Sequence, residues 1–169
     1  GIYKTRFIRP IRWVVSLWNK LLIPVKLEML ESRKETQGHR FLSPRMTEIK
    51  EAADYKKQLK RLNVIVDFEE RRDSIIKQIK LLEREFNFEV ELDNDLLMEV
   101  TNLVEWPTVI LGEFEEEFLE LPDEVLVTSM TLNQRFFPVF EKNKKQKKDK
   151  KKLLPFFVTV RNGNKKFIE

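Results

Sequence analysis

The chain has 169 residues and a formal net charge of +4, and 41% of its residues are hydrophobic and 36% charged. This length and composition predict one folded domain, residues 1–169, with one core under a strongly charged exterior, and they exclude a disordered protein. The absence of cysteine and the single histidine, His39, exclude a disulfide scaffold, a thiolate nucleophile, cysteine-ligated zinc and metal sites built on several histidines.

The net charge conceals a partition along the chain. Residues 1–90 carry 20 Lys and Arg against 13 Asp and Glu, and residues 91–134 carry 12 acidic residues and no basic ones. Residues 135–169 carry 12 Lys and Arg against 3 acidic residues. For any single charge a solubilising role is the simpler interpretation. The segregation nevertheless favours two differently charged faces, one suited to a polyanion and one to a basic partner or to solvent.

The ends of the chain and its apolar runs indicate what surrounds it. The run Trp13–Val25 is interrupted by Asn19 and Lys20, so it is too short and too polar to span a bilayer. The chain lacks an initiator Met and stops at Glu169 soon after a strand-like segment. We therefore expect an internal piece of a longer protein without membrane attachment.

The first 66 residues are predicted to combine two helices with short strands. Pro10 suits a first helical position, and apolar residues follow at helical spacing, which predicts a helix over Pro10–Trp18. The arginines of this segment face either phosphates or solvent, and the sequence leaves both open. The other expected elements are an edge strand over Leu21–Glu28, a loop over Glu31–Gln37, a strand over Gly38–Leu42, an amphipathic helix over Ala52–Leu62 and a buried strand over Val64–Val66.

The middle of the chain is predicted to alternate helices and strands. Asp67 is an expected N-cap with Glu70 as its capping-box partner, and a long amphipathic helix over Phe68–Phe86 follows. Pro107 ends the next helix, because proline disfavours helical geometry in the residue before it. The remaining elements are a strand over Phe88–Leu92, a helix over Asp95–Val104, a buried strand over Thr108–Leu111 and a helix from Pro122 to Leu132.

The C-terminal part is typical of a β-hairpin with strands Arg135–Glu141 and Leu153–Arg161. The loop between them, Lys142–Lys152, carries eight lysines and one aspartate, and we expect it to be flexible. It either contacts an RNA backbone in a salt-dependent manner or is a solvated loop without a partner. The complete pattern predicts an α+β fold, in which a mixed or antiparallel sheet packs against several amphipathic helices.

The sequence offers few candidates for catalysis. His39 is a possible general base or RNA contact, but without a nucleophile motif beside it a hydrogen-bonded structural role is favoured. The carboxylates of Glu113–Glu124 do not have the spacing of a metal-binding loop. They favour an acidic surface that faces solvent or a partner. We therefore assign no catalytic residue and no metal ligand.

Seven short motifs, spread in order over nearly the whole chain, resemble the beta subunit of bacterial-type glycyl-tRNA synthetase. They are RFIRPIRW at Arg6–Trp13, GHRFLSP at Gly38–Pro44, ADY at Ala53–Tyr55, VDFEER at Val66–Arg71, EVTNLVEWP at Glu99–Pro107, FLELPDEVL at Phe118–Leu126 and FP at Phe137–Pro138. Within that family the matched region is similar to the B3/B4 domain of phenylalanyl-tRNA synthetase, an α+β module. The lysine-rich loop departs from the shorter connection of the family.

The resemblance implies a role in glycine-tRNA ligase, a heterotetrameric aminoacyl-tRNA synthetase of the cytoplasm. In this family the alpha subunit carries the catalytic core, which uses ATP with Mg²⁺, and the beta subunit supplies tRNA recognition. The implied partners are the alpha subunit, tRNA(Gly) and the remaining domains of the beta subunit, and no cofactor is expected in this piece.

Three functional hypotheses follow. In the first, the chain is a non-catalytic tRNA-associated module whose backbone contacts are Arg6, Arg9, Arg12, Arg40, Arg135, Lys144, Lys145, Lys147 and Lys148. In the second, it is a structural or subunit-docking module whose acidic surface, Glu113–Glu124, faces a partner. In the third, it is a hydrolytic editing enzyme that depends on His39, and no residue pattern supports a hydrolytic site.

Overall fold

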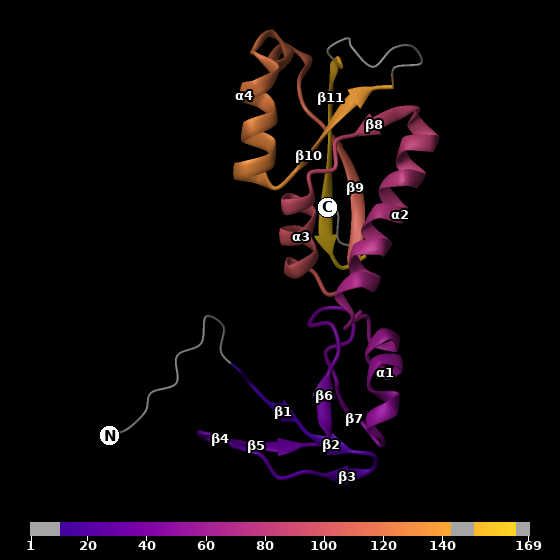
Figure 1. Cartoon of the computed structure of the whole chain (residues 1–169), viewed down its shortest axis with the longest axis vertical. Helices are drawn as coiled ribbons and strands as arrows, with labels where there is room; N and C mark the ends of the chain where they lie inside the picture. Colours follow the sequence, from indigo (N-terminus) through magenta and orange to yellow (C-terminus); the bar gives the residue numbers. More distant parts are fainter. Residues whose placement is uncertain (1–10, 143–150, 165–169) are drawn as a thin grey trace, which may run out of the picture. The chain divides into compact units, whose positions relative to one another are not determined.

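The computed structural model describes residues 11–142 and 151–164 and contains both helices and antiparallel sheet (Figure 1). It divides into two compact units, an N-terminal unit of residues 1–66 and a C-terminal unit of residues 67–169. The α+β class is confirmed, whereas the expectation of a single domain stays a prediction. The two units differ in net charge: the N-terminal unit carries 15 Lys and Arg against 6 acidic residues, and the C-terminal unit, which contains both the acidic segment and the lysine-rich loop, carries 17 against 22.

The N-terminal unit consists of short strands and one helix. Strand β5 lies between β1 and β4, parallel to β1 and antiparallel to β4, while β2 pairs with β3 and β6 pairs with β7 as antiparallel hairpins. The bounds are β1 (Val14–Val15), β2 (Leu17–Trp18), β3 (Leu21–Leu22), β4 (Lys26–Leu27), β5 (Leu30–Arg33), β6 (Glu35–Gln37), β7 (Met46–Glu48), a 3₁₀ turn (Ala52–Asp54) and α1 (Tyr55–Arg61). The helix expected over Ala52–Leu62 is confirmed.

The helix expected over Pro10–Trp18 is wrong in its described part, because Val14, Val15, Leu17 and Trp18 lie in strands. Asn19 adopts a left-handed conformation with φ of 52° and reverses the chain between β2 and β3. Asparagine tolerates this conformation, and β-branched and aromatic residues suit strands. Local turn chemistry and cross-strand pairing therefore outweigh the helical spacing.

Three further expectations for this unit are wrong. The polar segment expected as a loop, Glu31–Gln37, forms most of β5 and all of β6, and the expected strand at Gly38–Leu42 is a turn. Val64–Val66 forms no strand, although Ile65 is buried. Polar strands of this kind escape a search for apolar runs, because only one side chain of β6, Thr36, is buried.

The C-terminal unit contains a four-stranded antiparallel sheet with the strand order β8-β10-β11-β9. Its strands are β8 (Phe88–Val90), β9 (Pro107–Glu113), β10 (Phe137–Glu141) and β11 (Leu153–Asn162). Its helices are α2 (Phe68–Phe86), α3 (Asn94–Leu103), the 3₁₀ helix η2 (Glu116–Glu120) and α4 (Asp123–Thr128), which continues as the π-helical segment η3 (Ser129–Gln134). The expected helices, the middle strands and the C-terminal hairpin are confirmed, with shifts of a few residues at their ends.

The helices α2 and α3 both start at an aspartate cap, and the cap of α2, Asp67, is the one predicted above. The Asp67 carboxylate accepts a hydrogen bond from the Glu70 amide at 3.2 Å, and the Asp93 carboxylate accepts one from the Leu96 amide at 2.7 Å. An N-cap side chain satisfies an amide that has no partner within its helix. At the other end of α2, Asn87 takes the left-handed conformation and leads the chain into β8.

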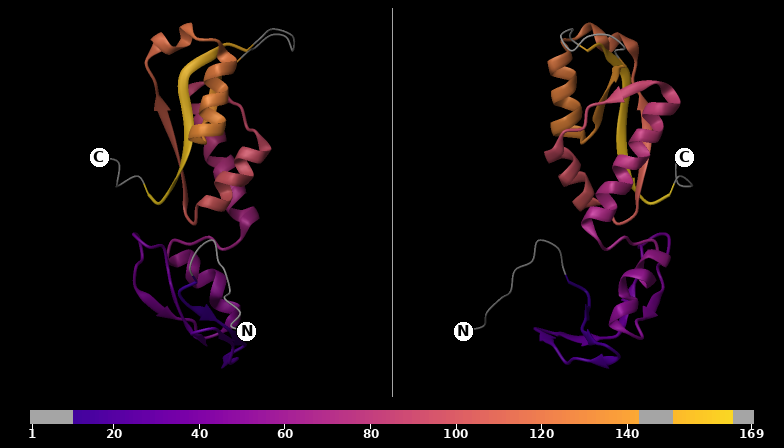
Figure 2. Two further views of the ribbon diagram at one scale, coloured as in Figure 1. Left: turned by 90° about the vertical axis from the view of Figure 1, so that its left-hand side faces the viewer. Right: turned by 45° about the vertical axis from the view of Figure 1, so that its right-hand side comes forward.

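The main core of the C-terminal unit lies between one face of the sheet and the helices α2 and α3, which lie on the same side of β9 and β11 in the left view of Figure 2. Its buried members are Ile75, Ile79, Phe88, Val90, Leu96, Leu97, Val100, Val104, Val109, Phe137, Val139 and Val158. Successive residues of a strand point to opposite faces. A second cluster, centred on Met130, Phe140 and Leu153, accordingly packs on the other face beneath α4 and η3.

A side chain of α2 forms a hydrogen bond with the outer edge of β8. Glu83 Oε1 accepts a hydrogen bond from the Val90 amide at 2.8 Å. Since β8 is the first strand of the sheet, no strand among the described residues lies beside this amide to accept its hydrogen bond. The carboxylate therefore takes the place of a strand partner.

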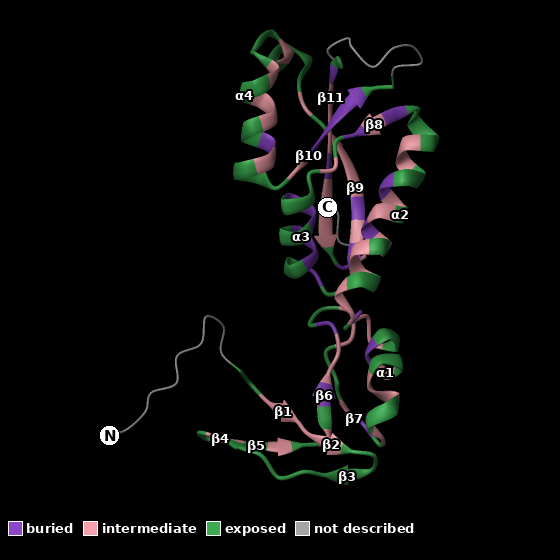
Figure 3. Cartoon of the chain, viewed as in Figure 1, coloured by how far each residue is buried: buried purple, intermediate pink, exposed green. Residues whose placement is uncertain are grey.

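Burial differs between the two units, as Figure 3 shows. In the N-terminal unit the buried apolar residues of the described chain are Ile49, Leu59 and Ile65, and they are joined by Thr36 and His39. Many large apolar side chains of the same unit are exposed, among them Trp18, Leu21, Met29 and Phe41.

No helix within residues 11–142 and 151–164 is both long enough and apolar enough to cross a membrane.

Candidate nucleic-acid interface

The structure describes three of the nine residues predicted to contact tRNA. Arg12 and Arg40 belong to the N-terminal unit and Arg135 to the C-terminal unit, and all three side chains are exposed. The other six predicted contacts lie outside the described residues: Arg6, Arg9, Lys144, Lys145, Lys147 and Lys148.

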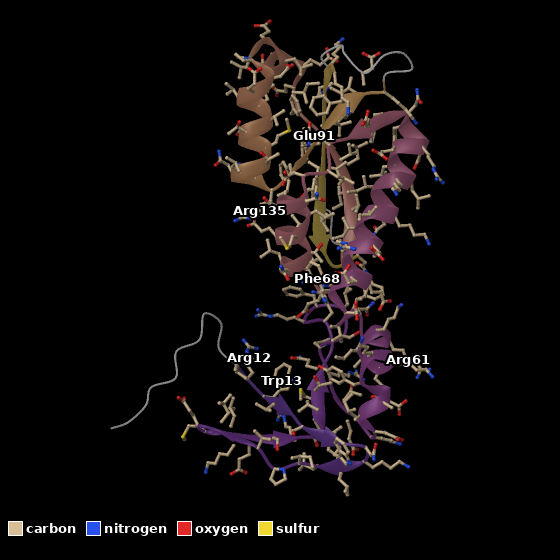
Figure 4. All side chains as sticks on the ribbon, viewed as in Figure 1. Arg12, Trp13, Arg61, Phe68, Glu91 and Arg135 are labelled. Atoms are coloured by element: carbon tan, nitrogen blue, oxygen red, sulfur yellow. The ribbon has the colours of Figure 1, made fainter. Side chains whose placement is uncertain are left out.

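Arg12 is followed by Trp13, an aromatic residue that directly precedes β1, and Figure 4 labels both. Trp13 Nε1 donates a hydrogen bond to Thr36 Oγ1 at 3.3 Å, and the Arg33 guanidinium lies 5.9 Å from the centre of the indole ring. This half-buried ring connects the segment of Arg12 to β6 while the arginine remains in solvent. Arg12 is therefore an accessible cation on a fixed segment.

A pocket of about 440 Å³ lies beside Trp13 in the N-terminal unit. It is lined by Trp13, Val15, Leu17, Thr36, Ala52 and Tyr55. Burial raises the pKa of the Tyr55 hydroxyl above its ordinary value, because a tyrosinate would lose hydration there. The phenol therefore stays neutral near pH 7.

Arg40 lies in the Gly38–Pro44 turn, which is organised by a buried histidine. His39 is 1% exposed, and its Nδ1 accepts hydrogen bonds from the amides of Phe41 and Leu42, each at 3.3 Å. Because Nδ1 accepts, the ring proton of neutral His39 belongs on Nε2. That nitrogen is buried, and no hydrogen-bond partner for it lies among the described residues. His39 is thus buried and hydrogen-bonded within its own turn, which agrees with the structural role favoured by the sequence.

The tip of this turn carries two exposed side chains. Phe41 is 71% exposed, and the Arg40 guanidinium lies 5.6 Å from the centre of its ring. A cation at this distance is attracted by the ring quadrupole. Arg40 is thus paired with an aromatic side chain in solvent, and within the described ranges no carboxylate holds it.

Arg135 has a different environment, in the C-terminal unit. It takes the left-handed conformation after η3, with φ of 57°, and β10 begins two residues later. Its guanidinium forms an ion pair with Glu99 of α3, and about half of each side chain is exposed. A phosphate at Arg135 would therefore compete with a carboxylate. Sequence reasoning missed this partner, because Glu99 is 36 residues away along the chain.

Acidic side chains surround a pocket of about 410 Å³ beside this ion pair. Its carboxylates are Glu91, Asp93, Asp95 and Glu99, and Leu96, Val127, Thr131, Leu132 and Pro138 complete the lining. Asp93 is already occupied as the cap of α3. No group of three or more His, Cys, Asp or Glu suited to a metal ion occurs in the part of the chain that the structure describes.

An apolar groove of about 200 Å³ lies on the other face of the C-terminal sheet. It is lined by Phe114, Phe118, Leu126, Ser129, Met130, Gln134, Phe136 and Phe157. The Phe136 and Phe157 rings stack with their centres 4.3 Å apart. Exposed carboxylates of the Glu113–Glu124 segment precede and follow Phe118 along the chain. The segment predicted to face solvent or a partner thus combines negative charge with exposed apolar surface.

The sequence motif Gly38–Pro44 marked Arg40, but it did not identify Phe41 as an exposed residue or His39 as the residue that holds the turn. The order of residues in this motif does not indicate which side chains are exposed. Only the three-dimensional structure separates Phe41 at the surface from His39 in the interior.

Comparison with known proteins adds a family to this geometry. The family described as glycyl-tRNA synthetase beta subunit matches residues 1–169. The glycine-tRNA ligase beta subunits of Listeria welshimeri and Bacillus subtilis are each 46% identical to the chain over 164 residues, which is 97% of this chain and 23% of each relative. That of Lactobacillus gasseri is 45% identical over 163 residues, or 96% of this chain and 22% of the relative. The chain therefore spans less than a quarter of the length of these relatives.

Proposed function

The chain belongs to the glycyl-tRNA synthetase beta subunit family, and from this premise we propose that it is a non-catalytic part of a glycine-tRNA ligase. In the proposed assembly an alpha subunit joins glycine to tRNA(Gly) with ATP and Mg²⁺, in the cytoplasm, and this chain supports tRNA binding within the beta subunit. The observation that carries the proposal is the match over all 169 residues, together with the exposed positive charge of the N-terminal unit.

The N-terminal unit has the charge distribution that an RNA backbone attracts. Eleven of the twelve Lys and Arg side chains in residues 11–66 are exposed, and the same residues contain six acidic side chains. Lysine and arginine that neutralise phosphates release condensed counterions, so RNA affinity falls steeply as salt rises. We therefore assign the main tRNA-facing surface to this unit. Its proposed contacts are Arg12 and Arg40, within the described residues, and Arg6 and Arg9 outside them, while Arg135 and the lysine-rich loop are additional contacts from the C-terminal unit.

A salt titration of tRNA binding tests this proposal. Binding of the chain to labelled tRNA(Gly) and to an unrelated tRNA is measured by fluorescence anisotropy from about 50 to 200 mM salt. The double variant Arg12→Gln/Arg40→Gln should weaken binding and flatten the salt dependence, because each lost phosphate contact lowers the slope by about one. The matched control is the double variant Lys77→Gln/Lys80→Gln on α2, which removes two exposed positive charges from the C-terminal unit.

The lysine-rich loop is tested separately, since Lys144, Lys145, Lys147 and Lys148 are also proposed contacts. A variant with the Lys142–Lys152 loop shortened should keep its preference for tRNA(Gly) if recognition belongs to the folded surface. If the unsubstituted chain binds both tRNAs equally and the loop-shortened variant binds neither, the chain binds tRNA only through non-specific electrostatic attraction. Absence of any tRNA binding would overturn the proposal for this chain.

A second candidate function is subunit docking, which the apolar groove and the neighbouring carboxylates of the Glu113–Glu124 segment favour. Residues 91–134 contain no Lys or Arg, and the groove exposes Phe118 beside glutamates. A basic surface with an apolar anchor has the complementary chemistry. Calorimetry with the alpha subunit in the absence of RNA distinguishes the two functions. If Phe118→Ser abolishes binding to the alpha subunit and leaves the tRNA affinity unchanged, docking is favoured as the function of the C-terminal unit.

A further inference from the structure

We propose that the Gly38–Pro44 turn is a preformed RNA contact in which the Arg40–Phe41 pair receives an unpaired base and its neighbouring phosphate, and in which His39 is a positioning residue. The inference rests on the proposed tRNA role of the chain and deepens it. It names the part of the tRNA that is recognised, a base outside a helix, and the side chain that recognises it, Phe41.

The turn is held from inside by hydrogen bonds that leave its tip in solvent. In addition to the two bonds to Nδ1, the His39 amide donates to the Leu62 carbonyl at 2.9 Å, and the Ser43 amide donates to the His39 carbonyl at 2.8 Å. The Ser43 hydroxyl donates to Asn63 Oδ1 at 3.0 Å, and the Gln37 amide group donates to the Pro44 carbonyl. The base of the turn is therefore fixed on both sides.

Close packing at Gly38 supports the same conclusion. A Cβ at this position would lie 2.5 Å from both the Cβ and the carbonyl oxygen of Leu62, which is closer than real contacts of this kind. Only glycine lets the turn approach the end of α1 so closely. The backbone of the turn is thus set by local contacts and not by the two side chains at its tip.

The exposed pair has the chemistry of a base-stacking platform. Unpaired RNA bases stack on aromatic rings and on guanidinium planes, while arginine also contacts phosphate. The Arg40 guanidinium lies over the Phe41 ring, 5.6 Å from its centre, so both groups are within reach of one nucleotide. A rigid turn lowers the entropy cost of ordering these groups on binding.

The charge around the turn favours RNA over a protein partner. Between Gln37 and Thr47 the sequence contains Arg40 and Arg45 and no acidic residue. Both arginines are exposed, and the unit that carries them has an excess of exposed basic side chains. RNA with unpaired bases offers phosphates to the arginines and a base to stack on the Phe41 ring.

The test uses the whole 169-residue chain and labelled tRNA(Gly), with an RNA duplex that contains no unpaired base as the second probe. Phe41→Leu keeps an apolar side chain but removes the ring, and it should weaken tRNA binding about five- to 150-fold, the range of stacking on one base. Binding of the duplex and the salt dependence should not change. Phe41→Tyr should bind tRNA as the unsubstituted chain does, and Phe86→Leu, another exposed phenylalanine, is the matched control.

The role of His39 is tested by a pair of variants. His39→Asn places an amide oxygen near the position of Nδ1, and it should retain more tRNA affinity than His39→Leu, which removes the acceptor of the Phe41 and Leu42 amides. Far-ultraviolet circular dichroism confirms that both variants are folded. Equal losses in the two folded variants would overturn the positioning role.

The outcomes for the inference and for the proposed function differ. If tRNA binds and Phe41→Leu binds equally well, the stacking contact is refuted and the proposed tRNA role stands. If Phe41→Leu instead weakens binding to the alpha subunit without RNA, the pair is a protein contact and the inference is overturned. If no tRNA binds to the unsubstituted chain, both are refuted.

Discussion

Gln78 on α2 completes the outer edge of β9 by bonding on either side of Thr108. Gln78 Oε1 accepts a hydrogen bond from the Val109 amide at 3.1 Å, and Nε2 donates to the Pro107 carbonyl at 3.1 Å. The amide of the side chain thus reproduces the two bonds that a neighbouring strand would make. Because β9 is the last strand of the sheet, these groups would otherwise need water.

Removing this amide should destabilise the C-terminal unit. Gln78→Leu leaves two partly buried backbone groups without partners, and we expect the free energy of unfolding to fall by about 1–3 kcal/mol. Urea unfolding followed by circular dichroism measures the change as a lower midpoint with an unchanged slope. Lys80→Ala, an exposed change on the same helix, should shift the midpoint little. An equal loss in both variants would mean that the helix and not the amide matters.

A side chain at Gly112 should displace the Phe157 ring and destabilise the C-terminal sheet. A Cβ there would overlap Phe157 Cζ, on the neighbouring strand β11. Gly112→Ala should lower the free energy of unfolding by about 1–3 kcal/mol, because it forces the Phe157 ring out of its place. The same substitution in a Phe157→Leu background should cost less, since a smaller side chain yields space. Additive effects in this double-mutant cycle would contradict the close approach as the cause.

The ion pair between Arg135 and Glu99 should limit the proposed tRNA contact of Arg135. Glu99→Gln frees the guanidinium and removes a negative charge, so tRNA affinity at low salt should rise roughly two- to threefold. Arg135→Gln should lower it, and the double variant should resemble Arg135→Gln. Anisotropy at two salt concentrations measures all three. If Glu99→Gln had no effect while Arg135→Gln weakened binding, the pair would not compete with RNA.

The raised pKa of Tyr55 predicts a pH dependence for the N-terminal unit. Burial favours the neutral phenol, so its contribution to stability is complete below the ordinary tyrosine pKa of about 10 and is lost as pH rises through the folded pKa. In an absorbance titration, the tyrosinate signal that Tyr55→Phe removes should appear above the ordinary pKa. A signal at the ordinary pKa would show that the pocket beside Trp13 does not bury the hydroxyl.

The sequence predicted the C-terminal unit far better than the N-terminal one, for a physical reason. Helix α2 has a sustained apolar stripe and a cap at Asp67, and both signals are local. The strands of the N-terminal unit are two to four residues long. Their formation depends on pairing with other strands and on single turn residues such as Asn19, so a short stretch of sequence does not predict them.

The candidate site likewise combines features that are visible in the sequence with features that depend on folding. The motif around Arg40 was visible in the sequence, whereas the exposure of Phe41 and the occupation of Arg135 by Glu99 depend on folding. Charge counts along the chain predicted two kinds of surface, and the two units differ in net charge, although the acidic segment and the lysine-rich loop belong to the same unit. What a linear sequence leaves out is which charged groups are already paired.

Helix α2 supplies partners to both outer strands of the C-terminal sheet, through Gln78 at β9 and Glu83 at β8. Unpaired strand edges are templates for association with other chains. Partial melting of this one helix would therefore uncover two such edges at once and expose the core face that it covers. The resistance of the molecule to self-association, and its yield on refolding, should accordingly depend on how firmly α2 stays folded, more than on the strength of the sheet itself.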